Sequence, residues 1–168
     1  AIFQPPEGFM VLKQERHMKS VQVDAILERL HCRDLPTIVF AVQGGSFSEG
    51  VDYTGEMALG AFVVGPPLPN FDFERERMRE YYQRKYGAGF RYAYSIPAMA
   101  KAVQAAGRVI RSETDRGLIV LMDDRFLDSG YSSAMPEDWF ESDVSELVSD
   151  SILSDVSEFW ADSSDSGG

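Results

Sequence analysis

Cysteine and histidine are scarce in this 168-residue chain, which has one cysteine and two histidines. The single Cys32 excludes an internal disulfide and a thiolate cluster, and His17 and His31 lack the spacing of metal ligands. No apolar run approaches twenty residues, and the start has neither a basic leader nor a cleavage site. We therefore expect no metal held by this chain alone, no membrane span, no export signal and a reducing cytoplasm.

Basic residues are missing from the last part of the chain. All 16 Lys and Arg lie at or before Arg125, where 16 Asp and Glu match them, and the other 11 acidic residues lie in 126–168. The net charge of −11 therefore belongs to the tail, and it says nothing about what the neutral body binds. With 44% apolar residues, the chain is long enough for one filled core, so we expect one domain.

Short apolar runs alternate with stretches of helical periodicity. The runs predict four buried strands, at 8–13, 37–43, 59–64 and 117–122. The periodic stretches predict helices from Ser20, as a cap, to about Leu30, from Phe71 to Tyr86 and from Ile96 to Arg111. Strands that alternate with helices predict an α/β fold, with a mainly parallel sheet between two helix layers.

The last of these helices is predicted to present two arginines on one face. At 100° per residue, Gly107, Arg108 and Arg111 fall within about 60° of Gln104. The opposite face is predicted to be core and holds Met99, Val103, Ala106 and Ile110. A glycine inside a helix costs about 1 kcal/mol against alanine, which favours close approach of a backbone or a phosphate there. Arginine suits phosphate because its fork binds two oxygens; the alternative is an amphipathic helix with solvated arginines.

A second candidate site is the loop after the strand at 37–43. It reads Gly44-Gly45-Ser46-Phe47-Ser48-Glu49-Gly50-Val51-Asp52. Its glycines permit tight turns that expose amides, its hydroxyls suit phosphate oxygens, and Asp52 suits a ribose hydroxyl or an arginine. Loops at the carboxyl ends of parallel strands are where ligands bind. The alternative is a plain strand-to-helix turn, since a phosphate loop with Lys and Ser/Thr occurs nowhere in the chain.

The order of these motifs resembles a known family. It runs Gly45-x3-Glu49-Gly50-x-Asp52, a strand ending at Gly65-Pro66-Pro67, Gln104-x2-Gly107-Arg108-x2-Arg111, and a strand ending at Asp123-Asp124-Arg125-Phe126. Over about residues 8–127 this resembles the second motor domain of superfamily 2 helicases, specifically the XPD/DinG group of DNA helicases. The resemblance implies a RecA-like three-layer α/β/α domain in 1–127. The missing initiator methionine and the absence of an opening strand and helix lead us to expect a truncated N-terminus.

The resemblance also implies roles for these residues. Gln104, Arg108 and Arg111 would match motif VI, with the two arginines as catalytic fingers on nucleotide phosphates, and Gly50 and Asp52 would join the nucleotide site. Gly45, Ser46 and Ser48 would contact single-stranded DNA. ATP and Mg²⁺ would be shared with a first motor domain of the same protein, absent here, which would also hold any iron–sulfur cluster. We therefore expect 5′ to 3′ helicase activity in the full protein, associated with DNA and nuclear if eukaryotic, and no ATP hydrolysis by this fragment alone.

The helix at 71–86 and its exit mix basic groups with aromatic rings. We expect Arg84, Lys85 and Arg91 to contact single-stranded DNA, because bases stack on such rings and phosphates attract the cations. The alternative is a solvated helix in which acids and bases pair locally, as Glu80 and Arg84 would at four-residue spacing.

The acidic residues 128–160 are predicted to form a helical extension. An apolar stripe recurs every four residues, at Val144, Val148, Ile152, Val156 and Trp160. The extension either packs on the body or competes with DNA for basic clusters, and residues 161–168 are expected to be disordered.

A different class of function remains open at this point. The chain would then be a non-catalytic α/β interaction module whose arginine face binds an acidic or phosphorylated partner. The two classes differ in one geometric expectation: a motor domain requires Asp52 and Arg111 at the same edge of the sheet.

Overall fold

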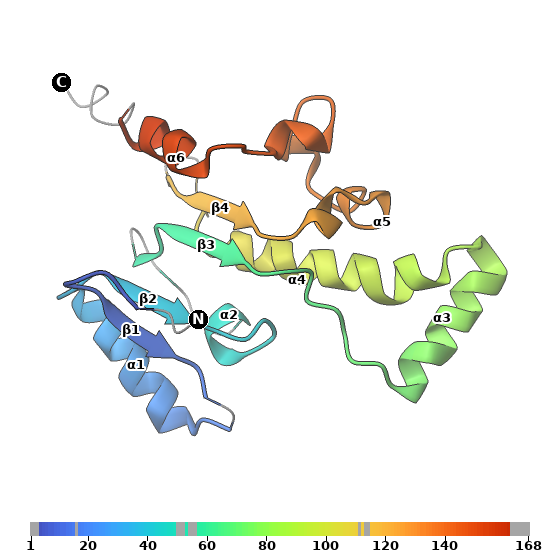
Figure 1. Ribbon diagram of the computed structural model, residues 1–168. Helices are drawn as coiled ribbons and strands as arrows, with labels where there is room; N and C mark the ends of the chain where they lie inside the picture. The colour runs from blue at the N-terminus through green and yellow to red at the C-terminus, as the bar shows by residue number, and fades with distance from the viewer. Residues whose placement is uncertain are drawn as a thin grey trace.

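The computed structural model describes residues 4–15, 17–49, 53, 57–110, 112 and 115–161. Its four strands are β1 (Met10–Lys13), β2 (Thr37–Phe40), β3 (Gly60–Val63) and β4 (Leu118–Leu121). Among the described residues they form two parallel pairs, β1 with β2 and β3 with β4 (Figure 1). The predicted α/β class with parallel strands is therefore confirmed.

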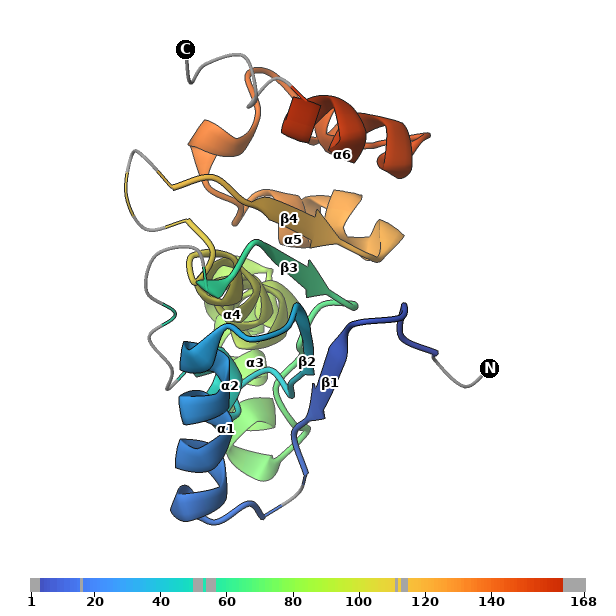
Figure 2. The ribbon, with the colours of Figure 1, turned by 90° about the vertical axis from the view of Figure 1, so that its left-hand side faces the viewer.

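The first pair is joined by helix α1 (Ser20–Cys32). The predicted cap is wrong by one residue, because Lys19 occupies the N-cap position and its backbone N–H donates to Gln22 Oε1 at 2.9 Å. At the other end Arg33 adopts the left-handed conformation, with φ of 51°, and its N–H donates to the Leu30 carbonyl. Figure 2 shows α1 along the β1–β2 pair.

The second pair is joined by a long helical excursion. Helix α3 (Phe73–Tyr86) is capped by the Asp72 carboxylate, which accepts from the Arg75 N–H at 2.7 Å, and ends at Gly87 with φ of 70°. A π-helix (Arg91–Ser95) then leads directly into α4 (Ile96–Ala106). Helix α4 packs against β3, whereas α3 projects away from the strands (Figure 1).

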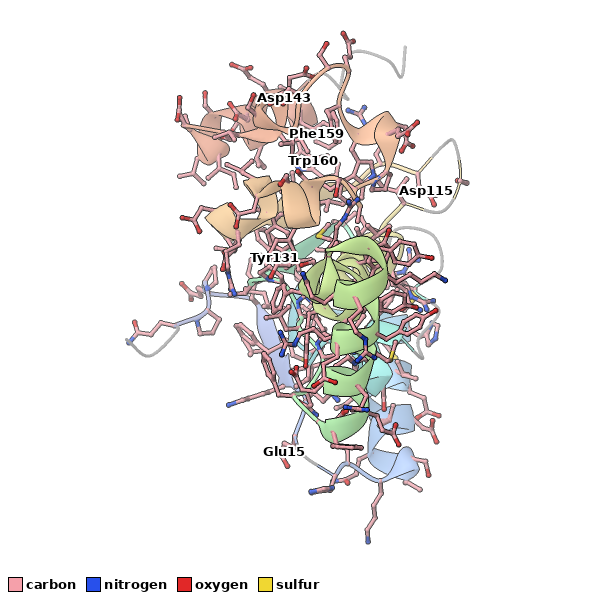
Figure 3. All side chains as sticks on the ribbon, turned by 90° about the vertical axis from the view of Figure 1, so that its right-hand side faces the viewer. Glu15, Asp115, Tyr131, Asp143, Phe159 and Trp160 are labelled. Carbon is pink, nitrogen blue, oxygen red and sulfur yellow. The ribbon has the colours of Figure 1, made fainter. Side chains whose placement is uncertain are left out.

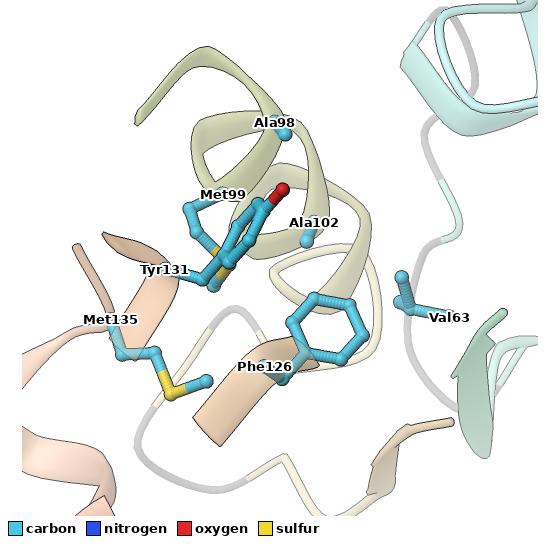
Figure 4. Packing of buried hydrophobic residues seen from close by; sticks show 7 residues of the cluster. All are labelled: Val63, Ala98, Met99, Ala102, Phe126, Tyr131 and Met135. Atoms are coloured by element: carbon cyan, nitrogen blue, oxygen red, sulfur yellow. The ribbon is translucent and has the colours of Figure 1, made fainter. Parts of the chain in front are cut away.

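The core lies where α4 meets β3 and the segment after β4. Its buried residues are Val63, Ala98, Met99, Ala102, Phe126, Tyr131 and Met135 (Figure 4). Alanines on α4 let the rings of Phe126 and Tyr131 approach the helix closely, and Met99 is fully buried. Residues after β4 thus complete the core, through the short helix α5 (Ser129–Ser132).

The apolar stripe at 144–160 contains two short elements where one long helix was predicted. A single 3₁₀ turn (Val144–Leu147) precedes α6 (Ile152–Ala161). Glu146 accepts backbone N–H groups from Glu141, Ser142 and Asp143, and the backbone becomes extended at Val148. These local bonds compete with helix hydrogen bonds, so the four-residue stripe does not become one helix. Residues 162–168, most of the predicted disordered tail, lie outside the described residues. In the described ranges, no helix has the length and apolar character needed to cross a membrane.

Candidate functional site

The loop after β2 folds into a turn tied to β1. The Gly45 N–H donates to the Val42 carbonyl at 2.9 Å and lies 3.1 Å from Ser48 Oγ, which in turn lies 3.0 Å from the Val42 carbonyl oxygen. From the end of β1, Gln14 Oε1 accepts the Val42 N–H at 3.1 Å. The carboxyl ends of both strands are thus held in one hydrogen-bonded unit.

Glycine is required at position 45 by packing inside this turn. A Cβ there would lie 2.3 Å from Gln14 Nε2 and 2.8 Å from the Val42 carbonyl oxygen. The Gly45 N–H and the Ser48 hydroxyl both bond within the turn, so they shape the loop. Ser46, the first residue of α2 (Ser46–Glu49), is exposed.

The far side of the same loop contacts the end of α4. Phe47 is buried and its carbonyl accepts the Tyr53 hydroxyl at 2.8 Å. Burial raises the pKa of the Tyr53 phenol, and the positive charge of Arg108 acts in the opposite direction. Because α2 packs on α4, the two predicted motifs meet in space.

The arginine segment does not have the geometry predicted for it. Helix α4 ends at Ala106, and Gly107 N–H donates to the Val103 carbonyl at 2.8 Å as the chain turns away. After the turn Ile110, which was predicted to lie in the core, is 41% exposed, whereas Val109 is buried. The prediction that Gly107 and Arg108 share a helix face with Gln104 is therefore wrong, and the prediction for Arg111 lies outside the described residues.

Gly107 is also not an interior glycine. It follows the last helical residue with φ of −64°, and a Cβ there would meet only ordinary contacts, 3.4 Å from the Val103 carbonyl oxygen. No helix-interior cost needs to be offset, so the expected close approach at this glycine has no basis. Gln104 is exposed and Arg108 is half-buried at the same end of α4.

Three predicted site residues, Gly50, Asp52 and Arg111, lie outside the described residues. The common edge expected for Asp52 and Arg111 therefore stays a prediction. Within the described ranges, no three His, Cys, Asp or Glu side chains form a group that could hold a metal ion.

Helix α3 presents cations and rings together. Tyr82 stacks on Tyr92 with centroids 5.0 Å apart, and Tyr86 lies 5.4 Å from Tyr92. Lys85 Nζ lies 5.1 Å from the Tyr86 ring centroid and 3.1 Å from the Tyr81 hydroxyl. The rings thus form a partly exposed cluster that carries one cation on its surface.

The predicted local pairing on α3 involves other residues. Glu80 pairs with Arg77 at 2.7 Å, and Glu76 pairs with Arg79 at 2.8 Å. In the part of the chain that the structure describes, Arg84 is exposed and forms no ion pair, and the same holds for Arg91. The acids of α3 are therefore matched nearer its start, and its end is left basic.

Comparison with known proteins places most of this chain in a family. The model of the helicase C-terminal domain family matches residues 4–142. The chain belongs to that family. The match spans both candidate motifs and continues through the segment that completes the core.

Relatives of this helicase C-terminal domain are much longer proteins. It is 36% identical over 91 residues to the ATP-dependent DNA helicase chl-1 of Caenorhabditis elegans, an alignment covering 53% of this chain and 11% of that protein. It is 34% identical over 102 residues to the ATP-dependent DNA helicase DinG of Photobacterium profundum, covering 60% of this chain and 14% of that protein. A solved structure of apo XPD aligns with TM-score 0.57 and 19% identity over 74% of this chain and 26% of that chain. The domain is thus that of the XPD/DinG group of DNA helicases, and it spans a small part of its relatives' length.

Two features of the helicase C-terminal domain were missed by the sequence analysis. A Cβ on Gly117 would clash with Val109 Cγ1, so this glycine lets the chain pass behind the turn at 107–110, called the arginine turn from here on. The Asp123 carboxylate accepts from Arg125 Nε at 2.8 Å and from a terminal nitrogen of Arg125 at 2.7 Å. This pair packs against Gly65, where a Cβ would lie 3.1 Å from the Arg125 terminal nitrogen. The sequence signals that could have predicted these two features are Gly117, just before the apolar strand β4, and the Asp123-x-Arg125 spacing just after it.

Proposed function

We propose that this helicase C-terminal domain is the second motor domain of an ATP-dependent DNA helicase that moves 5′ to 3′ along a single strand. The observation that supports it best is the packing of α2, which belongs to the loop after β2, on α4. A motor needs its nucleic-acid loop and its phosphate-binding arginines to move as one body. The packing of α2 on α4 would provide such a connection, and the hydrogen bond from Tyr53 to Phe47 ties the rest of the loop to α2.

ATP with Mg²⁺ fits the residues at this end of α4. Gln104 is exposed and Arg108 half-buried there, so both are accessible to a nucleotide presented by another motor domain. Bound ATP would supply the phosphoryl group that is transferred to water. Arg108 and Arg111 would donate to its phosphate oxygens, while Gly50 and Asp52 would line the same site from the loop. Arginine fingers of this kind raise phosphoryl-transfer rates about 10³–10⁵-fold.

Single-stranded DNA would contact two surfaces of this domain. Ser46 is the exposed hydroxyl of the loop after β2, with Gly45 and Ser48 setting the shape of its turn. Arg84, Lys85 and Arg91 would attract phosphates beside the tyrosine cluster of α3. Base stacking on such rings contributes about 1–3 kcal/mol per base.

The decisive test uses the full-length protein with both motor domains. Arg108→Ala and Arg111→Ala should each lower DNA-stimulated ATP turnover by about 10³-fold or more while retaining binding to oligothymidylate. Arg29→Ala on α1, whose guanidinium pairs with Asp34 far from the arginine turn, is the control and should keep full turnover. Unchanged turnover in Arg108→Ala and Arg111→Ala would reject the proposal.

The isolated chain gives a second test. It should hydrolyse no ATP, since the phosphate loop is absent from it. Measurable turnover by the isolated chain, abolished by Arg111→Ala, would contradict this. Specific binding of a phosphopeptide, without any ATP turnover by the full-length protein, would favour an interaction module instead.

The DNA surface is tested by charge reversal. The triple change of Arg84, Lys85 and Arg91 to Glu should weaken oligothymidylate binding and flatten its dependence on salt, because each lost phosphate contact removes counterion release. Arg29→Glu supplies the control for a general change in charge. Affinity and salt slope equal to wild type in the triple variant would exclude this surface.

A further inference from the structure

Helix α6 is attached to the body through an arginine that follows the arginine turn. The terminal nitrogen of Arg116 donates to the Phe159 carbonyl at 3.0 Å, and its guanidinium carbon lies 4.9 Å from the Phe159 ring centroid. Phe159 in turn meets the edge of Trp160, with centroids 5.0 Å apart. Figure 3 shows both rings on the side of α6 that faces the rest of the chain.

Arg116 supplies what α6 lacks as a helix. Ile152–Ala161 has ten residues, none of them buried and none in its last turn basic. An isolated helix of this length is marginal in water. Its last four carbonyls have no partner within the helix, and a cation is favourable at that end. The Phe159 carbonyl is one of these four, so Arg116 caps α6 from outside.

The sequence around Phe159 repeats one that lies twelve residues earlier. Ser142–Ser151 reads SDVSELVSDS and Ser154–Ser163 reads SDVSEFWADS, with seven of ten positions identical. The first copy places Leu147-Val148 where the second has Phe159-Trp160. Only the second copy therefore has an aromatic ring for a guanidinium.

The two copies adopt different structures. In the first, Asp143 caps a 3₁₀ turn by accepting the Ser145 N–H at 2.9 Å. In the second, the same five residues, SDVSE, lie within α6. Identical residues that form a helix only where an arginine meets their aromatic neighbour indicate that docking on Arg116 selects the helix.

The docking position lies directly behind the arginine turn. Gly117, next to Arg116, packs on Val109, next to Arg108. Docking therefore brings the acidic second copy, with Glu158 beside Phe159, to the same part of the domain as the phosphate-binding arginines of the proposed function. By contrast, α6 and α3 lie at opposite ends of the molecule (Figure 1), so the acidic segment does not cover the tyrosine cluster.

We propose that Arg116 and the second copy of the repeat form a reversible latch that shields the arginine turn from anionic ligands. When the latch is closed, α6 is helical and its carboxylates oppose the approach of a phosphate-bearing ligand. When it opens, Arg116 is released and the acidic segment moves away. The shielding rests on the proposed function, whereas the docking does not.

The docking is tested in the full 168-residue chain by amide hydrogen exchange in α6. Phe159→Leu gives the second copy the residue of the first and should speed exchange of the α6 amides about three-fold, the size of one exposed cation–π contact. Arg116→Ala also removes the charged hydrogen bond and should speed it about ten-fold or more. Leu147→Ala in the first copy is the matched control and should leave α6 unchanged. Exchange unaffected by both Phe159→Leu and Arg116→Ala would overturn the latch.

The shielding is tested with inorganic tripolyphosphate, a probe that needs no second motor domain. Phe159→Leu should lower the dissociation constant for tripolyphosphate about three-fold. Because this variant keeps every charge of the chain, the tighter binding would reflect release of α6. Looser α6 with unchanged tripolyphosphate affinity would overturn the shielding. Failure of the proposed function is a separate result, because it appears as full ATP turnover in Arg108→Ala and leaves the exchange measurements unaltered.

Discussion

The two strand pairs of this domain are built alike and buried differently. Each has two four-residue parallel strands with the same four-residue register. Around β3 and β4, helix α4 contributes four buried residues, and Val63 faces it from the strand. Around β1 and β2, no described residue from 4 to 43 is buried. Backbone pairing alone thus says little about how much side-chain packing supports a sheet.

The difference indicates two ways of holding strands together. The β3–β4 unit depends on apolar burial, which contributes about 25 cal/mol per Å² removed from water. The β1–β2 unit depends more on its backbone ladder and on side chains that bond the backbone, such as Gln14 and Ser48. The loop proposed to contact DNA combines both kinds of support, because Gln14 and Ser48 bond its backbone and Phe47 is buried where α2 packs on α4.

Truncation in the core should have the largest effect. Met99→Ala leaves a cavity at a fully buried site and should lower the free energy of unfolding by about 3 kcal/mol, measured by urea denaturation. Val11→Ala, in β1 and 37% exposed, removes less buried surface and should cost under about 1 kcal/mol. Equal losses would remove the contrast between the two units.

The arginine turn should show the next largest effect. Gly117→Ala places a Cβ against Val109 and should cost about 2 kcal/mol through overpacking. Adding Val109→Ala should recover part of that loss, although Val109→Ala alone is destabilising. Gly60→Ala is the matched control, since its Cβ would meet Leu118 at ordinary distances of 3.4 Å and more. Absence of rescue in the double variant would mean that the contact is not the cause.

Removing a turn hydroxyl should have a smaller effect, confined to the β1–β2 unit. Ser48→Ala deletes the hydroxyl that meets the Gly45 N–H and the Val42 carbonyl, and should cost about 1 kcal/mol. Hydrogen exchange should quicken at Gly45 and remain unchanged at β4. Ser46→Ala, on the exposed neighbour, should change neither quantity.

The smallest expected effect is the pH dependence of folding stability that comes from Asp123 and Arg125, at the end of β4. Hydrogen bonds from Arg125 lower the pKa of Asp123 from 3.8 to about 2. Because the folded-state pKa is the lower one, this stabilisation is complete above about pH 4 and is lost as the pH falls towards 2. Asp123→Asn should flatten the stability profile in that window, with Asp128→Asn as the control for removing one carboxylate. An unchanged profile in Asp123→Asn would exclude the pair as its source.

The sequence predicted the strands well and the ends of helices less well. Each of the four apolar runs contains one observed strand, because short continuous apolar runs rich in β-branched residues favour buried strands. The sequence predicted that α4 continues to Arg111, because the helical spacing of residues continues past Gly107, and spacing alone does not reveal where a turn ends a helix. The prediction of one helix over the apolar stripe at 144–160 was wrong for a similar reason. Asp143 and Glu146 accept local backbone hydrogen bonds there, and the spacing of apolar residues does not reveal such bonds.

The candidate site was predicted as two motifs, and the contact between them required the structure. Tyr53 was not singled out, because a lone tyrosine after a glycine-rich loop has no distinctive spacing. Its hydrogen bond to Phe47 holds the loop against α2, which packs on α4. Contacts of that kind come from tertiary packing and leave no period in the sequence.

The π-helix that joins α3 to α4 determines what the loss of one residue at this point would do to the domain. Across Arg91–Ser95 the Ile96 N–H reaches the Arg91 carbonyl five residues back, so this turn holds one residue more than an α-helical turn. Deleting one residue there would restore ordinary helix and rotate everything before it by about 100° around the axis of α4. The tyrosine cluster would then face a new direction while the core stayed in place. A single inserted or lost codon at this turn is thus enough to re-aim one surface of the domain against the other.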